Sequence, residues 1–376
     1  MIERPLWLHR IEETWKKAPI VWLSGVRRVG KTTLAHSLRD ALHMNCDLPS
    51  VRTQLRDPEA FFKSVSHRVV VLDEVHQLED PSQVLKIAAD HFPKLRILAT
   101  GSSTLAATHK FKDSLTGRKR AIHLLPVLLS ELHAFGIRDL RKRLFHGGLP
   151  PALLAEEKDE GFYSEWLDSY YARDVQELFR IEKRKNFLLL VETLLRQNAG
   201  MVDVNNLADM CSLSRPTIMN YLEVLELTHV ICLLRPYHGG GKQELVRQQR
   251  VYGFDTGFVS HAKGWGELRT EDCGLLWENI VLEHLMSLPS SPKIFFWRDK
   301  QQREVDYVIP QSRDVCHAIE CKWNPDRFET KSLKAFRDLH PKGKNFVIAP
   351  NIERSYTRRV NGFEIVYASP QDLDLH

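Results

Sequence analysis

Residues 25–32, GVRRVGKT, constrain the fold of this chain more than any other stretch of its sequence. They lie between a short apolar run, PIVWLS, and a segment whose apolar residues recur at helical spacing. The pattern is G-x-x-x-x-G-K-T, and its fixed positions are Gly25, Gly30, Lys31 and Thr32. In such a loop the glycines expose backbone N–H groups to phosphate oxygens, the lysine neutralises the β- and γ-phosphates, and the threonine hydroxyl ligates Mg²⁺. The pattern therefore predicts a nucleotide-binding loop between a strand and a helix.

A second motif supplies acidic groups for the same site. In RVVVLDEV, four hydrophobic residues precede Asp73 and Glu74. Asp73 is expected to hold Mg²⁺ through water, and Glu74 to orient or deprotonate the water that attacks the γ-phosphate. Two surface acids at a strand end are the alternative, which the presence of both motifs disfavours. We therefore predict an enzyme that hydrolyses ATP with Mg²⁺, and we include Arg28 and Thr33 in the nucleotide-binding set.

The segments around these motifs predict the fold class. RVVVLDEV and LRILATGSS are short continuous apolar runs, as expected for strands buried on both faces of a parallel sheet. KTTLAHSLRDALHM, residues 31–44, is expected to be one helix. Strands that alternate with helices predict a doubly wound parallel α/β domain over residues 1–145. A helical lid or linker is expected over residues 146–200.

Composition excludes some classes of protein. With 376 residues, of which 43% are hydrophobic and 27% charged, an ordinary globular protein of two to three domains is expected. No run approaches the roughly eighteen apolar residues of a membrane span, and the first fifteen residues lack the pattern of a secretory signal. The six cysteines show no pair or finger spacing, so reduced thiols in the cytoplasm are expected. The net charge of +5 permits a polyanionic partner without demanding one.

The nucleotide motifs and their order resemble those of the AAA+ ATPases. That resemblance implies a first sensor residue in LATGSS, where Ser102 or Ser103 would serve. It also implies an arginine finger in LTGRKR, with Arg118 the first candidate and Arg120 the second; a solvated basic cluster is the alternative. A finger acts on the ATP of a neighbouring subunit, so a homo-oligomer is expected, with a hexameric ring as its form. In FHGGLPP, Pro150 resembles an element of the lid over the nucleotide, or else marks a turn that does not contact ATP.

Residues 201–260 have the pattern of a winged helix-turn-helix. VNNLADMC and SRPTIMNYLEVLE predict two short helices, and Asn205 or Asp203 can cap the first. Four apolar residues of the second helix are spaced to face inward: Ile218, Tyr221, Leu222 and Leu225. The strand HVICLLRPY, the turn HGGGK and a returning strand would complete the wing.

The outward side chains of this segment are candidates for DNA contact. They are Arg215, Thr217 and Asn220 of the second helix, and Lys242 at the wing, where Arg247 and Arg250 add basic charge. The second helix of such a unit can enter a groove of duplex DNA. Winged helices also dock proteins, and this set is short of arginine and lysine, so a protein partner stays open beside the favoured DNA partner.

Near the end of the chain, residues 303–323 place thirteen residues between Asp306 and Glu320, and Lys322 follows. This order and spacing resemble the PD-(D/E)xK restriction-endonuclease-like fold, expected over residues 261–376. The resemblance implies that Glu278, on an upstream helix, completes a centre in which Asp306 and Glu320 hold Mg²⁺ or Mn²⁺ and Lys322 steadies the attacking water. The first carboxylate comes in EVD rather than PD, which leaves metal chemistry possible. The alternative is a DNA-holding or structural role without cleavage.

The whole chain resembles a widespread bacterial and archaeal family in which an AAA+ module precedes a nuclease-like domain of formerly unassigned function. YYARDV, VYGFDTG, GLLWENIV, EVDYVI and IECKW match its pattern in order. The resemblance implies a DNA-binding ATPase that couples ATP hydrolysis to remodelling of, or translocation along, duplex or branched DNA in repair or recombination. The alternatives are an ATP-gated switch or defence protein that acts through a protein partner or a triggered nuclease, and a plain ATP-binding regulator.

Overall fold

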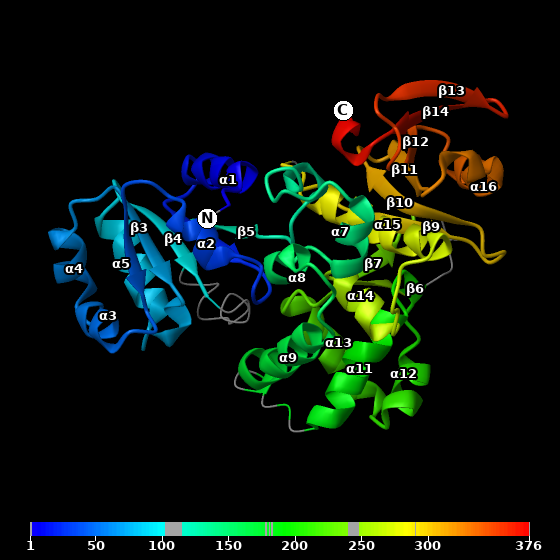
Figure 1. Cartoon of the computed structure of the whole chain (residues 1–376). Helices are drawn as coiled ribbons and strands as arrows, with labels where there is room; N and C mark the ends of the chain where they lie inside the picture. The colour runs from blue at the N-terminus through cyan, green and yellow to red at the C-terminus, as the bar shows by residue number, and fades with distance from the viewer. Residues whose placement is uncertain are drawn as a thin grey trace.

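The computed structural model describes residues 2–101, 115–176, 179, 181, 183–239, 248–289 and 291–375. Its amino-terminal part contains a sheet of five parallel strands in the order β2-β3-β4-β1-β5 (Figure 1). The strands are β1 (Ile20–Ser24), β2 (Ala41–Asn45), β3 (Val69–Asp73), β4 (Arg96–Thr100) and β5 (Lys119–His123). This sheet confirms the predicted parallel α/β domain.

Among the described residues, five helices pack around this sheet. They are α1 (Pro5–Trp15), α2 (Lys31–His36), α3 (Pro49–Gln54), α4 (Pro58–Ser64) and α5 (Pro81–His91). α1 is amphipathic, and its Trp7, Ile11 and Trp15 side chains are buried in the core. Trp15 Nε1 also donates to the Ile97 carbonyl of β4 at 3.0 Å. Burial of these three side chains stabilises the docking of α1 by on the order of 5 kcal/mol.

Residues 31–44 do not form the single helix that was predicted. α2 ends at His36, and β2 begins at Ala41. Between them Asp40 has a φ of 55°, a left-handed conformation that interrupts a helix. β2 then pairs in parallel with β3 along its whole length, as far as the pair of Asn45 and Asp73. The prediction was wrong because a short apolar run carries too little periodicity to separate a helix from a strand, and sheet pairing decides.

Helices dominate the region that follows β5 (green in Figure 1). They are α7 (Leu140–His146), α8 (Pro150–Leu154), α9 (Glu160–Tyr170), the π-helical turn η4 (Tyr171–Gln176), α11 (Arg184–Arg196), α12 (Val204–Cys211), α13 (Arg215–Leu227) and α14 (Thr256–Ala262). Asp203 caps α12 by accepting hydrogen bonds from two backbone N–H groups, and Ser214 caps α13 by accepting one from the Thr217 N–H. The four side chains of α13 that were predicted to face inward are buried.

A mixed sheet of nine strands follows, in the order β13-β14-β12-β11-β10-β9-β7-β8-β6. The strands are β6 (Gly200–Met201), β7 (Ile231–Pro236), β8 (Arg250–Gly253), β9 (Phe295–Arg298), β10 (Glu304–Pro310), β11 (Cys316–Cys321), β12 (Asn345–Ile348), β13 (Tyr356–Val360) and β14 (Phe363–Ala368). β7 pairs with β9 in parallel, so the sheet continues across the boundary predicted at residues 260 and 261. The predicted domain limits themselves stay predictions.

Two helices cover opposite faces of this sheet, α15 (Thr270–Met286) and α16 (Thr330–Leu339). Successive residues of β12 show the alternation: Phe346 packs in the core that contains α15, and Val347 packs in the core that contains α16. The carboxyl-terminal segments, including α16 and β13, lie at the far end of the molecule from α1 (Figure 1).

A buried polar cluster joins α7 to α14 and α15. Arg143 of α7 donates from Nε to the Val127 carbonyl at 2.8 Å and from Nη1 to Thr256 Oγ1 at 3.0 Å. The same guanidinium forms an ion pair with Glu283 of α15. All of these side chains are buried, so the cluster fixes the helical region to the carboxyl-terminal region at one point.

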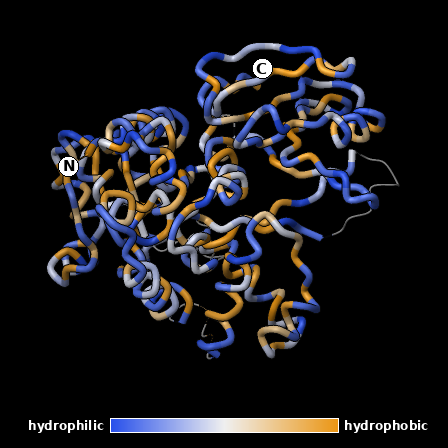
Figure 2. The backbone as a smooth tube through the Cα atoms, turned by 45° about the vertical axis from the view of Figure 1, so that its right-hand side comes forward, coloured by the Kyte–Doolittle hydropathy of each residue, from blue (hydrophilic) through white to orange (hydrophobic). Residues whose placement is uncertain are grey.

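Hydrophobic and hydrophilic residues alternate in short stretches along the backbone (Figure 2). Among the described residues, no helix is both long enough and apolar enough to cross a membrane.

Candidate functional site: a nucleotide pocket and a second charged centre

The loop of residues 25–30 connects β1 to α2 in the way the motif predicts. Gly25 has a φ of 149°, and a Cβ atom on it would lie 2.8 Å from the Leu124 carbonyl oxygen. Gly30 has a φ of 100° and immediately precedes α2. Both conformations favour glycine, so the two fixed glycines set the path of the loop.

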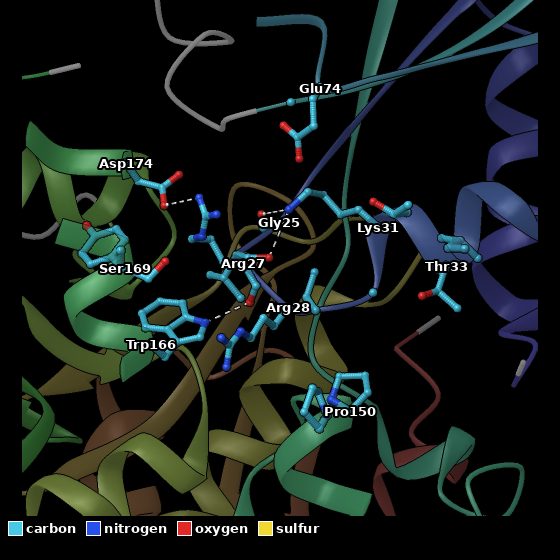
Figure 3. A pocket seen from close by; sticks show the side chains of 18 of the residues that line it. Gly25, Arg27, Arg28, Lys31, Thr33, Glu74, Pro150, Trp166, Ser169 and Asp174 are labelled. Carbon is cyan, nitrogen blue, oxygen red and sulfur yellow. Dashed lines mark hydrogen bonds and ion pairs between the residues drawn. The ribbon is translucent and has the colours of Figure 1, made fainter. Parts of the chain in front are cut away.

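Lys31 and Thr32 begin α2 and face the loop and the acidic motif. Lys31 Nζ donates to the carbonyl oxygens of Gly25 at 2.8 Å and Val26 at 3.1 Å (Figure 3). Burial lowers the pKa of Lys31, although the nearby carboxylate of Glu74 opposes that shift. Thr32 Oγ1 donates to Asp73 Oδ2 at 2.9 Å. The hydroxyl of Thr32 and the carboxylate of Asp73, which are predicted to serve Mg²⁺, are therefore adjacent. Phosphate oxygens would replace the loop carbonyls as the partners of Lys31.

Thr100, at the end of β4, was not predicted to belong to the site. Its hydroxyl forms a hydrogen bond with Asp73 Oδ1 and accepts from the Glu74 backbone N–H at 3.1 Å. It thus holds both members of the acidic motif from the neighbouring strand. Ser102 and Ser103, which were predicted to act as the sensor, lie outside the described residues. The available signal was that Thr100 is the first polar residue after the apolar run of β4.

Glu74 points toward the loop from the end of β3 (Figure 3). Its backbone has a φ of 56°, and its carboxylate pairs with His76 Nδ1 at 3.2 Å. Burial raises the pKa of Glu74, but the hydrogen bond and charge of His76, with the charge of Lys31, lower it more, and the resulting pKa lies below its usual value. Glu74 is therefore an ionised carboxylate at neutral pH, as a residue that polarises water must be.

The opposite wall of the pocket comes from the helical region. Trp166 Nε1 of α9 donates to the Arg27 carbonyl at 3.0 Å, and the Arg27 guanidinium pairs with Asp174 of η4 at 3.3 Å (Figure 3). The Arg28 guanidinium lies 5.3 Å from the ring centre of Phe162. The two loop arginines thus contact α9 and η4 of the helical region. None of these partners was predicted.

Together these walls enclose a cavity of about 920 Å³. Its lining includes the whole loop, Thr33, Glu74, Pro150, Asp174 and Thr228. A Cβ atom on Gly30 would lie 4.0 Å from Pro150 Cγ, so this proline contacts the nucleotide loop. The volume is in the range of small-molecule and cofactor pockets, and the lining combines a phosphate loop with carboxylates that suit Mg²⁺.

Arg118 lies away from this pocket. It directly precedes β5, whose first residue pairs with Ile20 at the start of β1, whereas the nucleotide loop follows the end of β1. Its guanidinium makes two hydrogen bonds to the Asp90 carboxylate, at 2.5 and 3.0 Å. Because the strands are parallel, Arg118 and the loop are at opposite edges of the sheet. Arg118 therefore cannot reach the ATP of its own chain, and its role as a finger for a neighbour stays a prediction.

The predicted DNA-contacting residues of α13 lie on the surface. Arg215 and Asn220 are exposed and Thr217 is partly exposed, whereas Lys242 lies outside the described residues. Residues 201–230 carry four acidic side chains against one arginine. This surface therefore lacks the positive charge that usually accompanies phosphate contact.

Far from the nucleotide pocket, the four predicted nuclease-like residues meet in the nine-stranded sheet. Lys322 Nζ lies 2.8 Å from Glu320 Oε2 and 3.8 Å from Asp306 Oδ2. Asp306 Oδ2 also accepts a hydrogen bond from the Cys321 backbone N–H at 2.7 Å. Glu278 of α15 approaches from the covering helix, where its backbone carbonyl accepts from a tyrosine of β10. The four residues therefore lie together at one charged centre.

Two further residues lie at this centre; Tyr252 was not predicted, and Arg250 was predicted to add basic charge at the wing, whereas it is 2% exposed. Tyr252 of β8 donates from its hydroxyl to Glu278 Oε2 at 3.1 Å. Arg250, also of β8, pairs with Glu304 Oε2 at 2.5 Å and lies 3.9 Å from both Glu278 Oε2 and Asp306 Oδ1. Their only signal was the family-like stretch VYGFDTG, which begins one residue after Arg250.

A cation of the chain lies among the carboxylates of the predicted metal site. Within the described part of the chain, no group of three or more acidic, histidine or cysteine side chains is placed to hold a metal ion. Glu278 Oε2 accepts a hydrogen bond from the Tyr252 hydroxyl and lies 3.9 Å from Arg250 Nη1. The assignment of Mg²⁺ or Mn²⁺ to Asp306 and Glu320 stays a prediction.

Burial and mutual repulsion raise the pKa values of two acids of this centre. Burial, reinforced by the charge of Asp306, raises the pKa of Glu278 and of Glu320. Burial lowers the pKa of Lys322, but the charges of Asp306 and Glu320 raise it more, so Lys322 stays protonated. Glu320 Oε1 is buried without a hydrogen-bond partner among the described residues.

Comparison with known families identifies one part of the chain. Residues 17–133 match the family model of an AAA domain. The amino-terminal part is an AAA-type ATPase domain. Residues 137–269 match a model described as a domain of unknown function (DUF8612), and residues 273–368 match a domain of unknown function (DUF4143). The nuclease-like assignment of the carboxyl-terminal region stays a resemblance.

Relatives of the whole chain carry no assigned activity. An uncharacterized protein of Mycobacterium tuberculosis is 26% identical over 329 residues, which cover 83% of this chain and 72% of that protein. An uncharacterized protein of Haemophilus influenzae is 23% identical over 403 residues, with 98% and 97% covered. The crystal structure of a signal transduction ATPase with numerous domains from Pyrococcus horikoshii matches 76% of this chain and 46% of its own, at 12% identity and a TM-score of 0.29. This chain thus spans less than half of that protein, and so low a score carries no argument.

Proposed function

We propose that this protein is an ATP-driven switch, in which the nucleotide bound by the AAA domain sets the position of α13 on the helical region. The observation that carries the proposal is the two-sided pocket, with the nucleotide loop on one wall and α9, η4 and Thr228 on the other. A nucleotide in this pocket contacts both walls at once. ATP and ADP differ at the γ-phosphate, so they differ in how strongly they hold the two walls together.

A short series of contacts leads from the loop to α13. Arg27 is held by Asp174 and, through its carbonyl, by Trp166. The Trp166 ring stacks on Tyr170 with ring centres 5.4 Å apart, and the Tyr170 hydroxyl lies 2.6 Å from Thr228 Oγ1. Thr228 is the residue that ends α13. A phosphate that competes with Asp174 for Arg27 would therefore loosen η4 and α9 and, through them, the end of α13.

The finer proposal is that α13 engages duplex or branched DNA, so that ATP hydrolysis remodels or moves along it. The exposed Arg215 and Asn220 at the start of α13 support this proposal. A protein partner is the second candidate, because residues 201–230 carry four acidic side chains against one arginine and because Met210 and Met219 are 54% and 56% exposed. Methionines that project from a surface suit an adaptable protein contact better than phosphate contact.

We further propose that the active form is a homo-oligomer, with a ring as the expected arrangement. Arg118 sits at the edge of the sheet that faces away from the chain's own pocket, where it can serve only a neighbouring subunit. Its pairing with Asp90 in the single chain would then be exchanged for the neighbour's phosphates.

Hydrogen exchange tests the switch. In a Glu74→Gln chain, which should bind ATP without hydrolysing it, ATP is expected to change amide exchange in residues 204–227 severalfold. Adding Asp174→Asn should remove most of that change while ATP still binds, because the charge that holds Arg27 is lost. Asp168→Asn is the matched control, since Asp168 lies on the adjoining helix α9 but pairs with Arg184 on the surface. Exchange in α12 and α13 that ignores bound ATP would contradict the switch.

The same protein then separates the two partner classes. ATP turnover of the unaltered chain is measured with and without four-way-junction or duplex DNA. A severalfold stimulation that Arg215→Ala and Asn220→Ala abolish supports DNA as the partner. Turnover that no DNA changes overturns the DNA proposal and leaves the protein partner.

A further inference from the structure

The charged centre of the nine-stranded sheet contains a cation that belongs to the chain itself. Arg250 of β8 is 2% exposed, and its guanidinium faces three carboxylates. Nη2 lies 2.5 Å from Glu304 Oε2, and Nη1 lies 3.9 Å from one oxygen each of Glu278 and Asp306. A single buried guanidinium therefore supplies positive charge to three acids from two different elements, β10 and α15.

Neighbouring aromatic side chains fix this guanidinium in place. The Arg250 Nη1 atom lies 3.5 Å from the Tyr252 hydroxyl, which itself donates to Glu278. The guanidinium carbon lies 5.2 Å from the centre of the Phe296 ring. A side chain held on several sides in this way is a built part of the centre, unlike a surface arginine that happens to approach it.

We propose that Arg250 is the resident cation of this centre, and that it excludes a divalent metal from the carboxylates of Glu278, Asp306 and Glu320. Mg²⁺ and Mn²⁺ need several oxygen ligands at about 2 Å in a regular arrangement. Here Glu278 is engaged by Tyr252 and Arg250, and any dication between the acids would also face the positive charge of the guanidinium.

The consequence is a change of role for the centre. Arg250 lies on β8, before α14 in the chain, whereas its acidic partners lie on β10 and α15 in the carboxyl-terminal region. The centre therefore joins the two regions by ion pairs, beside the joint that β7 and β9 make through backbone pairing. Removing either the guanidinium or its acidic partners would leave an uncompensated buried charge and destabilise this joint.

One atom could be taken to favour a metal instead. Glu320 Oε1 is buried without a hydrogen-bond partner among the described residues, and its other oxygen contacts Lys322. Lys322 Nζ, 2.8 Å from Glu320 Oε2, already supplies positive charge to this carboxylate. Metal binding by the chain with Arg250 unchanged would therefore count against the proposal, and its absence would support the proposal.

Manganese binding tests the proposal without any measurement of catalysis. Free Mn²⁺ is followed by electron paramagnetic resonance as it is added to the nucleotide-free full chain, with Asp73→Asn to remove the metal position of the AAA domain. This parent chain is expected to bind no Mn²⁺ at 100 μM metal, on the order of the affinity of a weak protein site. Adding Arg250→Gln is expected to create one site per chain, and adding Asp306→Asn to that variant should remove it.

The matched control is Arg298→Gln. Arg298 also pairs with Glu304, at 3.6 Å, but no contact takes it to Glu278 or Asp306, so its loss should create no site. If the parent chain binds one Mn²⁺ and Asp306→Asn removes that binding, the proposal is overturned. This outcome does not depend on whether an Arg250 variant folds. An Arg250→Gln chain that folds and still binds no Mn²⁺ would also overturn it.

Discussion

A single hydroxyl organises the acidic half of the ATP site. Thr100 bonds the Asp73 carboxylate and the Glu74 backbone, so it fixes the residue that is predicted to serve Mg²⁺ and the residue that is predicted to serve water. The serines predicted to act as the sensor lie outside the described residues.

Replacing Thr100 by valine should slow ATP turnover while leaving ATP affinity nearly unchanged. Valine has the same shape but cannot hydrogen-bond, and a bond to a charged group contributes about 1.5–3 kcal/mol, or roughly 10- to 150-fold in rate. Steady-state turnover and equilibrium nucleotide binding measure the two effects separately. Thr100→Ser keeps the hydroxyl and should keep most of the turnover. A valine variant with full turnover would show that Thr100 has no part in orienting Asp73 and Glu74.

At the scale of elements, two glycine-containing turns interlock. Asp255, which caps α14, accepts a hydrogen bond from the Gly148 backbone N–H at 2.6 Å and another from the Gly257 backbone N–H at 2.8 Å. Gly147, with a φ of 81°, passes so close that a Cβ atom on it would lie 1.9 Å from Asp255 Oδ1. The stretches HGGLPP and FDTG are therefore complementary halves of one buried contact.

Gly147→Ala should destabilise the protein far more than Gly136→Ala. Both glycines have positive φ, so alanine costs about 1–2 kcal/mol at either position. Nothing lies within 4 Å of a Cβ atom at Gly136, whereas at Gly147 the new atom collides with Asp255. An added cost of about 2 kcal/mol would lower the midpoint of thermal unfolding by roughly 4–8 °C beyond the Gly136 variant. Equal midpoints for the two variants would mean that the two turns are not in contact.

The comparison of elements also shows what the sequence could predict. Both nucleotide motifs, the strands that carry them, and the convergence of Asp306, Glu320 and Lys322 were predicted, because each depends on local spacing. β2 was mistaken for helix, and β13 and β14 were not predicted, because their places depend on pairing with distant strands.

The long-range ion pairs of the two sites were not predicted, for the same reason. Arg27 meets Asp174 across 147 residues, and Arg250 meets Glu304 across 54. Neither pair leaves a pattern in the sequence around it, since a surface arginine and a buried one look alike without the fold.

At the scale of the whole molecule, a half-buried histidine pair connects the AAA domain to the helical region. His123 ends β5, and His229 directly follows Thr228, the residue that caps the end of α13. The centres of the two rings are 3.8 Å apart. Burial lowers the pKa of His229 to about 4, and burial together with His229 and Lys31 lowers the pKa of His123 well below its usual value. Both rings are therefore neutral where they meet, and protonating either one places a charge inside the contact between the two regions.

This pair should make the protein sensitive to acid. A histidine in the unfolded chain has a pKa of about 6.5, so the unfolded state binds more protons than the folded state as pH falls from about 6.5 toward about 4. Stability is thus full above pH 6.5 and decreases through that window, by at most about 3 kcal/mol for His229. His229→Asn removes the titrating ring and suits the φ of 61° at this position, so it should flatten the dependence of the unfolding midpoint on pH. The exposed His133→Asn is the control, and an unchanged slope in His229→Asn would place the acid sensitivity elsewhere in the molecule.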